Sequence, residues 1–204
     1  MKSPPRSAAS SGYGAWCRRD TASGKGTQMS LPAWVSQPAY FSSPRHRVWL
    51  RREIAPSLLV EPSGPLGFIL HNPSIAAEIE NDPTAIRGMR FAQDAGAREM
   101  IFVNAATGIA TDADDLADME DPIGPMADEA LRVAAEYCLH SGGKLVAAWG
   151  CPKGKAKTKR LMQERFEHIK ALGLPLHVLR VTASGHPEHP LYLPANLRPV
   201  PWRY

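Results

Sequence analysis

The chain has 204 residues and a mass of 22.3 kDa, which corresponds to one domain with room for a tail. Hydrophobic residues make up 44% and charged residues 22%, so a packed core is possible. No apolar run is long enough for a membrane span, and the first residues lack the apolar stretch of a secretory signal. The three cysteines lie far apart, which favours a reducing compartment, and we predict a cytoplasmic protein without disulfides.

The first 44 residues are rich in Ser, Gly, Pro and Ala and show no sustained periodicity. We predict that residues 1–44 form a disordered tail and that residues 45–204 form a single domain. Alternatively, Met29 is the true first residue of the protein. Trp34, Tyr40 and Phe41 are exceptions in the tail, because their side chains could dock onto the domain.

Short apolar segments alternate with amphipathic ones along the domain. In chain order, we predict strands at 47–51, 66–70, 99–104, 145–150 and 176–181, with helices at 85–95, 125–140 and 158–172. Residues 185–204 are rich in Pro, and we expect them to be irregular. This alternation predicts an α/β fold: a three-layer sandwich with a mainly parallel four-stranded central sheet and an N-terminal edge strand or hairpin.

Charge is distributed unevenly around a formal net charge of +4. The segment 111–129 contains eight acidic residues and no Lys or Arg, whereas five of the eight residues at 153–160 are basic. Both segments could be solvated surface loops. Alternatively, Lys153, Lys155 and Lys157 contact phosphate groups of a bound nucleic acid or nucleotide.

Polar residues follow several of the predicted strands, and parallel strands bring their carboxyl ends to one edge of the sheet. Four segments should therefore converge there, at residues 72–74, 104–107, 150–153 and 182–189. Asn72 and Asn104 could cap turns, or their amides could hold a water molecule or a substrate carbonyl.

The late loop of the domain carries His186 and His189, each followed by a proline that stiffens the chain. An imidazole aimed by such a loop can donate a hydrogen bond to developing negative charge. Exposed loop histidines and a metal site that includes Glu188 are the alternatives. We predict neither a metal nor a cofactor.

Residues 40–202 resemble the bacterial and phage family of domain of unknown function 1643. The resemblance is carried by NPSIA at 72–76, NDPT at 81–84, RFA at 90–92, DPIG at 121–124, AWG at 148–150 and GHPEHPLYL at 185–193. The order of these motifs is also similar, more distantly, to that of the uracil-DNA glycosylase superfamily, which implies a glycosylase-like fold.

The second resemblance implies roles for particular residues. Asn72 would hold the attacking water, Asn104 together with Ser74 would bind the base, and His189 would contact the departing base. His186 is the rival for that last role. The implied function is recognition of a nucleobase, nucleotide or nucleic acid, with hydrolysis of an N-glycosidic bond as the reaction. A non-catalytic binding module and an enzyme acting on a small molecule unrelated to nucleic acid are the alternatives.

Overall fold

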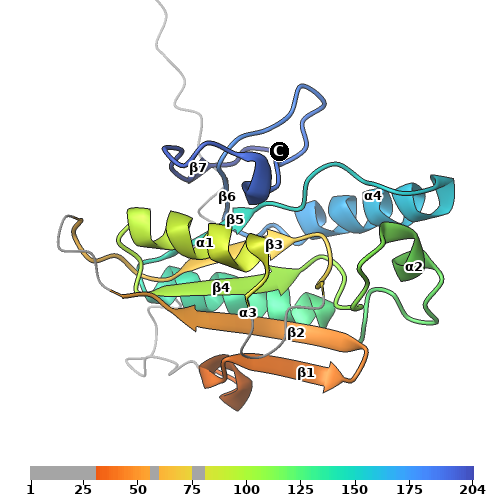
Figure 1. Ribbon diagram of the computed structural model, residues 1–204, viewed down its shortest axis with the longest axis horizontal. Helices are drawn as coiled ribbons and strands as arrows, with labels where there is room; N and C mark the ends of the chain where they lie inside the picture. Colours follow the sequence, from red (N-terminus) through yellow and green to blue (C-terminus); the bar gives the residue numbers. More distant parts are fainter. Residues whose placement is uncertain (1–30, 56–59, 75–80) are drawn as a thin grey trace, which may run out of the picture. The chain divides into compact units, whose positions relative to one another are not determined.

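In the computed structural model, the described residues are 31–55, 60–74 and 81–204, and they build a seven-stranded sheet (Figure 1). The strands lie in the order β1-β2-β4-β3-β5-β6-β7. Their bounds are β1 (Ala39–Ser43), β2 (His46–Glu53), β3 (Leu66–Leu70), β4 (Glu99–Asn104), β5 (Lys144–Ala147), β6 (Leu176–Val178) and β7 (Val200–Pro201).

The four central strands, β4, β3, β5 and β6, are parallel, and they confirm the predicted central sheet. Of the two predicted alternatives, an N-terminal edge strand or a hairpin, the structure shows a hairpin of β1 and β2, and β1 lies in the segment that was predicted to be disordered. Strand β7 was not predicted, because its segment reads as irregular and Pro-rich. Trp202 anchors this segment by donating its backbone N–H to the carbonyl of Leu176 at 2.9 Å, beside the antiparallel pairing of β7 with β6.

The helices are α1 (Pro83–Asp94), α2 (Ala113–Ala117), α3 (Ala127–His140) and α4 (Ala156–Ala171), with 3-10 turns η2 (Ala33–Ser36) and η3 (Pro190–Tyr192). Asp82 caps α1 by accepting the N–H of Ala85 at 2.7 Å, and Pro83 suits the first position of the helix. Helix α2 lies within the acidic segment that we expected to be a loop, and Asp112 caps it.

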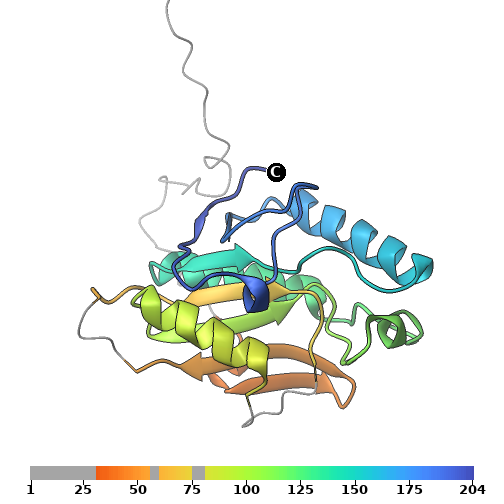
Figure 2. The ribbon, with the colours of Figure 1, turned by 45° about the horizontal axis from the view of Figure 1, so that its top comes forward.

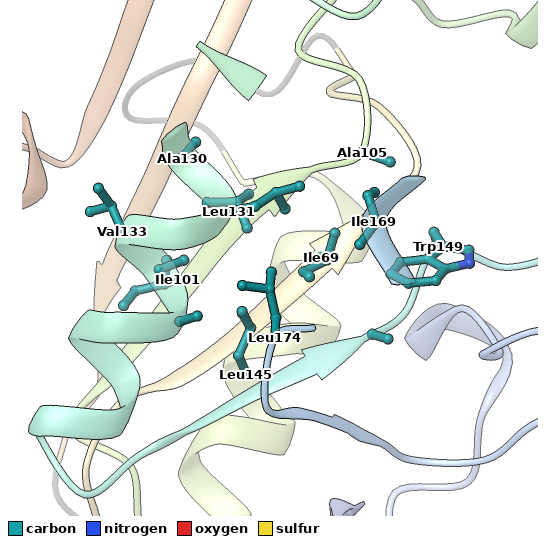
Figure 3. Packing of buried hydrophobic residues seen from close by; sticks show 14 of the residues in the cluster. Ile69, Ile101, Ala105, Ala130, Leu131, Val133, Leu145, Trp149, Ile169 and Leu174 are labelled. Carbon is teal, nitrogen blue, oxygen red and sulfur yellow. The ribbon is translucent and has the colours of Figure 1, made fainter. Parts of the chain in front are cut away.

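The helices cover the two faces of the sheet, and Figures 1 and 2 show α1 and α3 on opposite faces. Because side chains alternate along a strand, Ile69 and Ile101 join the core beside α3 and α4, while Phe68 and Phe102 join the core beside α1. Figure 3 shows Ile69 and Ile101 against α3, with Leu131 of that helix. Within the described ranges, no helix is long and apolar enough to cross a membrane.

Residues Leu31–Tyr204 form one compact unit, and η2 and β1 of this unit lie within the segment 1–44 that was predicted to be a disordered tail. Trp34 is buried, stacks on Tyr40 with ring centroids 5.7 Å apart, and meets Trp49 edge-on at 5.3 Å. Phe41, in contrast, is exposed. The first 30 residues of the predicted tail, together with Ile75 and Ala76 of the motif that begins at Asn72, lie outside the described residues.

The order of the strands places β3 at a topological switch point. The chain leaves β3 through α1 on one face and enters β4, then returns through α3 on the other face to β5, on the far side of β3. The connections that follow neighbouring strands therefore diverge at the carboxyl end of β3. Crevices for ligands form at such points in α/β sheets.

Candidate binding cavity

A cavity of about 290 Å³ opens at the carboxyl ends of the central strands. Leu70 of β3 and Phe102 of β4 line it from the sheet, and His71 and Asn72 line it directly after β3. The other lining residues come from β2 (Arg47), from segments around α1 and α2 (Ser74, Asp82, Thr84, Ala110, Thr111, Ala113), from the loop after β5 (Trp149, Gly150, Lys153), and from the late loop (His189, Leu191, Tyr192).

The side chain of Asn72 is held by backbone carbonyls. Its Nδ2 donates to the carbonyl oxygen of Pro73 at 3.0 Å and to that of Ala110 at 2.8 Å. The amide oxygen therefore faces His71, whose Nδ1 lies 3.0 Å from it. Because an amide oxygen can only accept, Nδ1 of His71 carries the hydrogen.

The ring of His71 lies in an apolar setting beside the cavity. It meets the ring of Phe166 edge-on, with centroids 5.7 Å apart. Burial lowers the pKa of His71 below 6.5, against the hydrogen bond with Asn72, and the positive charge of Lys153 lowers it further. His71 is therefore neutral at pH 7.

His189 is fixed by the late loop, where it precedes the first residue of η3. Its Nδ1 accepts the backbone N–H of Leu191 at 3.3 Å. Burial lowers its pKa to about 4, and Lys153 and His71 act in the same direction, while Asp82 opposes them. The ring is neutral at pH 7, and since Nδ1 accepts, Nε2 carries the hydrogen.

Among the described residues that line the cavity, positive charges outnumber negative ones. Arg47 is only 3% exposed, and although this burial lowers its pKa to about 10, the guanidinium stays charged at neutral pH. Lys153 adds a second cation. Asp82 contributes one negative charge, and its two carboxylate oxygens accept from the backbone N–H of Ala85 and from the hydroxyl of Ser74.

An aromatic ring lies beside Lys153. Tyr192 is 68% exposed and lines the cavity, and Nζ of Lys153 lies 5.3 Å from the centre of its ring. The tilted ring of His189 lies on the same tyrosine, with centroids 5.9 Å apart. The cavity thus combines positive charge with a flat apolar surface.

Four of the eight site residues expected from the sequence line this cavity, namely Asn72, Ser74, Lys153 and His189. Asn104 lies next to it in the sheet, as the register partner of Leu70, and alternation places its side chain on the same face as Phe102. Asn104 is 1% exposed, and neither atom of its amide has a hydrogen-bond partner in the described part of the chain. Its role in base binding stays a prediction.

His186 does not line the cavity. Its backbone N–H binds the hydroxyl of Thr182 at 3.1 Å, which closes the turn at the start of the late loop. Glu188, which we considered as a metal ligand, is paired with Arg180 through two bonds of 2.6 and 2.8 Å. Among the residues that the structure describes, no group of three potential metal ligands occurs.

Lys155 and Lys157 also lie outside the cavity, because they meet the acidic segment instead. The backbone N–H of Lys155 donates to Asp114 at 2.6 Å, and Nζ of Lys157 pairs with Asp118 at 2.9 Å. The acidic and basic segments of the sequence thus neutralise each other in part where α2 meets the start of α4. Their contact with phosphate stays a prediction.

Sequence reasoning missed His71, Arg47 and Tyr192. His71 could have been predicted, because it is the first residue after the buried strand and directly precedes Asn72. Arg47 reads as an outward-facing residue of an edge strand, but β2 is an inner strand of the sheet and Arg47 is 3% exposed. Tyr192 needs the position of η3, which no pattern in the sequence gives.

The fold and the cavity define an α/β protein with a basic, partly aromatic cavity at the switch point of a mainly parallel sheet. The chain belongs to the family described as "Protein of unknown function (DUF1643)", whose profile matches residues 47–191. This match confirms the first resemblance and spans the cavity residues from Arg47 to Leu191. No curated protein and no solved structure is significantly similar to the chain.

Proposed function

We propose that the cavity binds a nucleotide, or a nucleotide unit within a nucleic acid, and that the protein hydrolyses its N-glycosidic bond. The observation that carries the proposal is the pairing of two cations, Arg47 and Lys153, with the exposed ring of Tyr192 at one cavity. A nucleotide carries both complementary features, since its phosphate is anionic and its base is flat.

The position of the cavity supports the proposal. Ligands of open α/β sheets bind outside the carboxyl ends of the strands, and this cavity lies at that edge beside β3 and β5. A volume of about 290 Å³ is at the small end of the range for ligand pockets, which suits one nucleotide unit rather than a larger ligand. A glycosylase-like fold is part of the same proposal.

The reaction needs a bound water molecule, an extruded base and stabilisation of negative charge on that base. His189 supplies a donor for the departing base, because its Nε2–H is not needed by the loop that holds Nδ1. Lys153 and Arg47 are the cationic side chains at the cavity that would bind phosphate. No strong nucleophile is required.

A non-catalytic binding module is the second candidate, and one observation favours it. The carboxylate of Asp82 is engaged by Ala85 and Ser74, and the NH₂ group of Asn72 is engaged by backbone carbonyls. The NH₂ group of Asn72 therefore has no hydrogen left to donate to a water molecule, and the Asp82 carboxylate already accepts two hydrogen bonds.

The experiment incubates the full chain with duplex and single-stranded oligonucleotides that carry uracil or modified pyrimidines, and it measures free base. Calorimetric titration with uridine monophosphate, uridine and inorganic phosphate runs in parallel. Base release supports the enzyme, whereas nucleotide binding without base release supports the binding module. If none of these ligands binds, both candidates are contradicted and an unrelated small-molecule substrate becomes the better explanation.

A further inference from the structure

The two histidines of the cavity are held in opposite tautomers. Nδ1 of His71 donates to Asn72, which leaves Nε2 as the acceptor nitrogen of the neutral ring. Nδ1 of His189 accepts from the backbone of Leu191, which leaves Nε2 as the donor. One ring therefore offers a lone pair and the other an N–H.

The acceptor nitrogen of His71 is also unpaired. Its Nε2 is buried and has no hydrogen-bond partner within the described ranges. The same is true of the indole N–H of Trp149, whose ring stacks on Phe166 with centroids 5.1 Å apart. A buried polar atom without a partner is costly to keep, and His71 and Trp149 both line the cavity and both contact Phe166. A ligand or its attacking water would satisfy such atoms.

We propose that His71 and His189 act as an acid–base pair, in which Nε2 of His71 accepts a proton from the attacking water and Nε2–H of His189 hydrogen-bonds to the departing base. This inference rests on the proposed function for the identity of the substrate. It assigns the water-activating role to His71, a residue that the sequence did not single out.

The step balances without a further reactant. The water oxygen forms a bond to C1′ of the sugar as the N-glycosidic bond breaks, and the electron pair of that bond leaves with the base. The proton taken up by His71 then passes to the base anion or to solvent. No oxidant, reductant or metal ion takes part.

Asn72 is a positioning residue in this arrangement. Two backbone carbonyls fix its amide, and the amide oxygen in turn fixes the tautomer of His71. A second partner of this kind usually sets which imidazole nitrogen carries the proton. Removing Asn72 should therefore change the protonation pattern of His71 rather than only the stability of the fold.

The charged groups around the pair set its dependence on pH. Lys153 lies near both rings, Asp82 lies near His189, and Arg47 lines the same cavity. His71 must be unprotonated to act, and burial holds its pKa below 6.5, so activity should fall only as the pH drops through that lowered value.

The first test is independent of any substrate. The full chain is labelled with ¹⁵N-histidine, and the nitrogen shifts at pH 7 report which ring nitrogen carries the hydrogen. We expect Nδ1–H for His71 and Nε2–H for His189, and a mixture of both tautomers for His71 in Asn72→Ala. The matched control is Asn196→Ala, an exposed asparagine that does not line the cavity. An Nε2–H or doubly protonated His71 in the native chain would overturn the pair.

The second test measures base release from oligonucleotides. His71→Ala should slow release by about a hundredfold or more, as expected for loss of a general base, while His140→Ala, at the exposed end of α3, should leave the rate unchanged. An unchanged rate in His71→Ala would overturn the role of His71 alone. If the native chain releases no base, the proposed hydrolysis is wrong. The ¹⁵N measurement would still decide whether His71 and His189 have opposite tautomers.

Discussion

The roles of single residues depend on which of their atoms are already bound. Asn72 and His71 are neighbours in sequence and both follow β3, yet the backbone uses the amide of Asn72 and leaves Nε2 of His71 without a partner among the described residues. Sequence reasoning found the strand end and the asparagine there. It could not assign the roles, because the carbonyl of Ala110 that binds Asn72 comes from a segment 38 residues away.

The low pKa of His189 should make stability depend on pH. The folded protein holds this pKa at about 4, whereas the unfolded chain has the ordinary value of 6.5, so between these values the unfolded chain binds more protons. The free energy of unfolding should therefore fall as the pH decreases from about 6.5 to about 4. Urea unfolding at several pH values measures this. His189→Asn keeps a side chain that can cap η3 and should flatten the dependence; an unchanged dependence would contradict the assigned burial.

Lys153 should contribute more to binding of a nucleotide than the other lysines of its loop. Loss of one charge-assisted contact costs about 1.5–3 kcal/mol, so Lys153→Ala should weaken uridine monophosphate binding by about tenfold or more. Lys144→Ala is the control, because that exposed lysine begins β5 at the opposite end of the strand. Calorimetry measures the affinity for uridine monophosphate. If both variants lose the same affinity, the nucleotide is attracted by the overall charge of the protein and not by Lys153 in particular.

At the level of elements, α2 and the start of α4 depend on each other. Lys155 precedes α4 without a side-chain cap of its own, and Asp114 of α2 accepts from its backbone N–H at 2.6 Å and from the hydroxyl of Thr158 at 2.8 Å. Gly154 has a φ of +91° and passes so near Asp114 that an added Cβ would lie 2.5 Å from its carboxylate. This cap explains why the acidic and basic segments lie together.

Asp114→Ala should destabilise the protein, because the backbone N–H of Lys155 and the hydroxyl of Thr158 lose their acceptor, whereas Asp115→Ala, on the exposed side of α2, should have little effect. The thermal midpoints of the two variants, compared with that of the native chain, measure the difference. Identical midpoints for Asp114→Ala and the native chain would show that the contact contributes nothing to stability.

At the scale of the whole molecule, the alternation of apolar strands with amphipathic helices was enough to predict the parallel centre of the sheet. The two edges were harder, for a physical reason. Strand β1 precedes the predicted domain and β7 lies in a Pro-rich segment. Neither segment shows the period of a buried strand, and each forms by antiparallel pairing, β1 with β2 and β7 with β6.

Trp34 tests whether residues before position 45 contribute to the folded core. This side chain is 7% exposed and packs on Trp49 and Tyr40, so Trp34→Ala should destabilise the protein by about 3 kcal/mol, the lower part of the range for a buried aromatic residue. Phe41→Ala, at an exposed position of β1, should cost far less. Urea unfolding that gives both variants the same small loss would place the start of the core after β1.

Nucleotide binding in the cavity is tested most directly by titrating the ¹⁵N-histidine-labelled chain with uridine monophosphate and following the histidine nitrogen signals. If the cavity binds the nucleotide, the signals of His71 and His189 shift together and saturate, while that of His140, at the end of α3, stays constant. If the signals of His71 and His189 do not change at millimolar nucleotide, or if only histidines outside the cavity shift, the cavity does not bind the nucleotide.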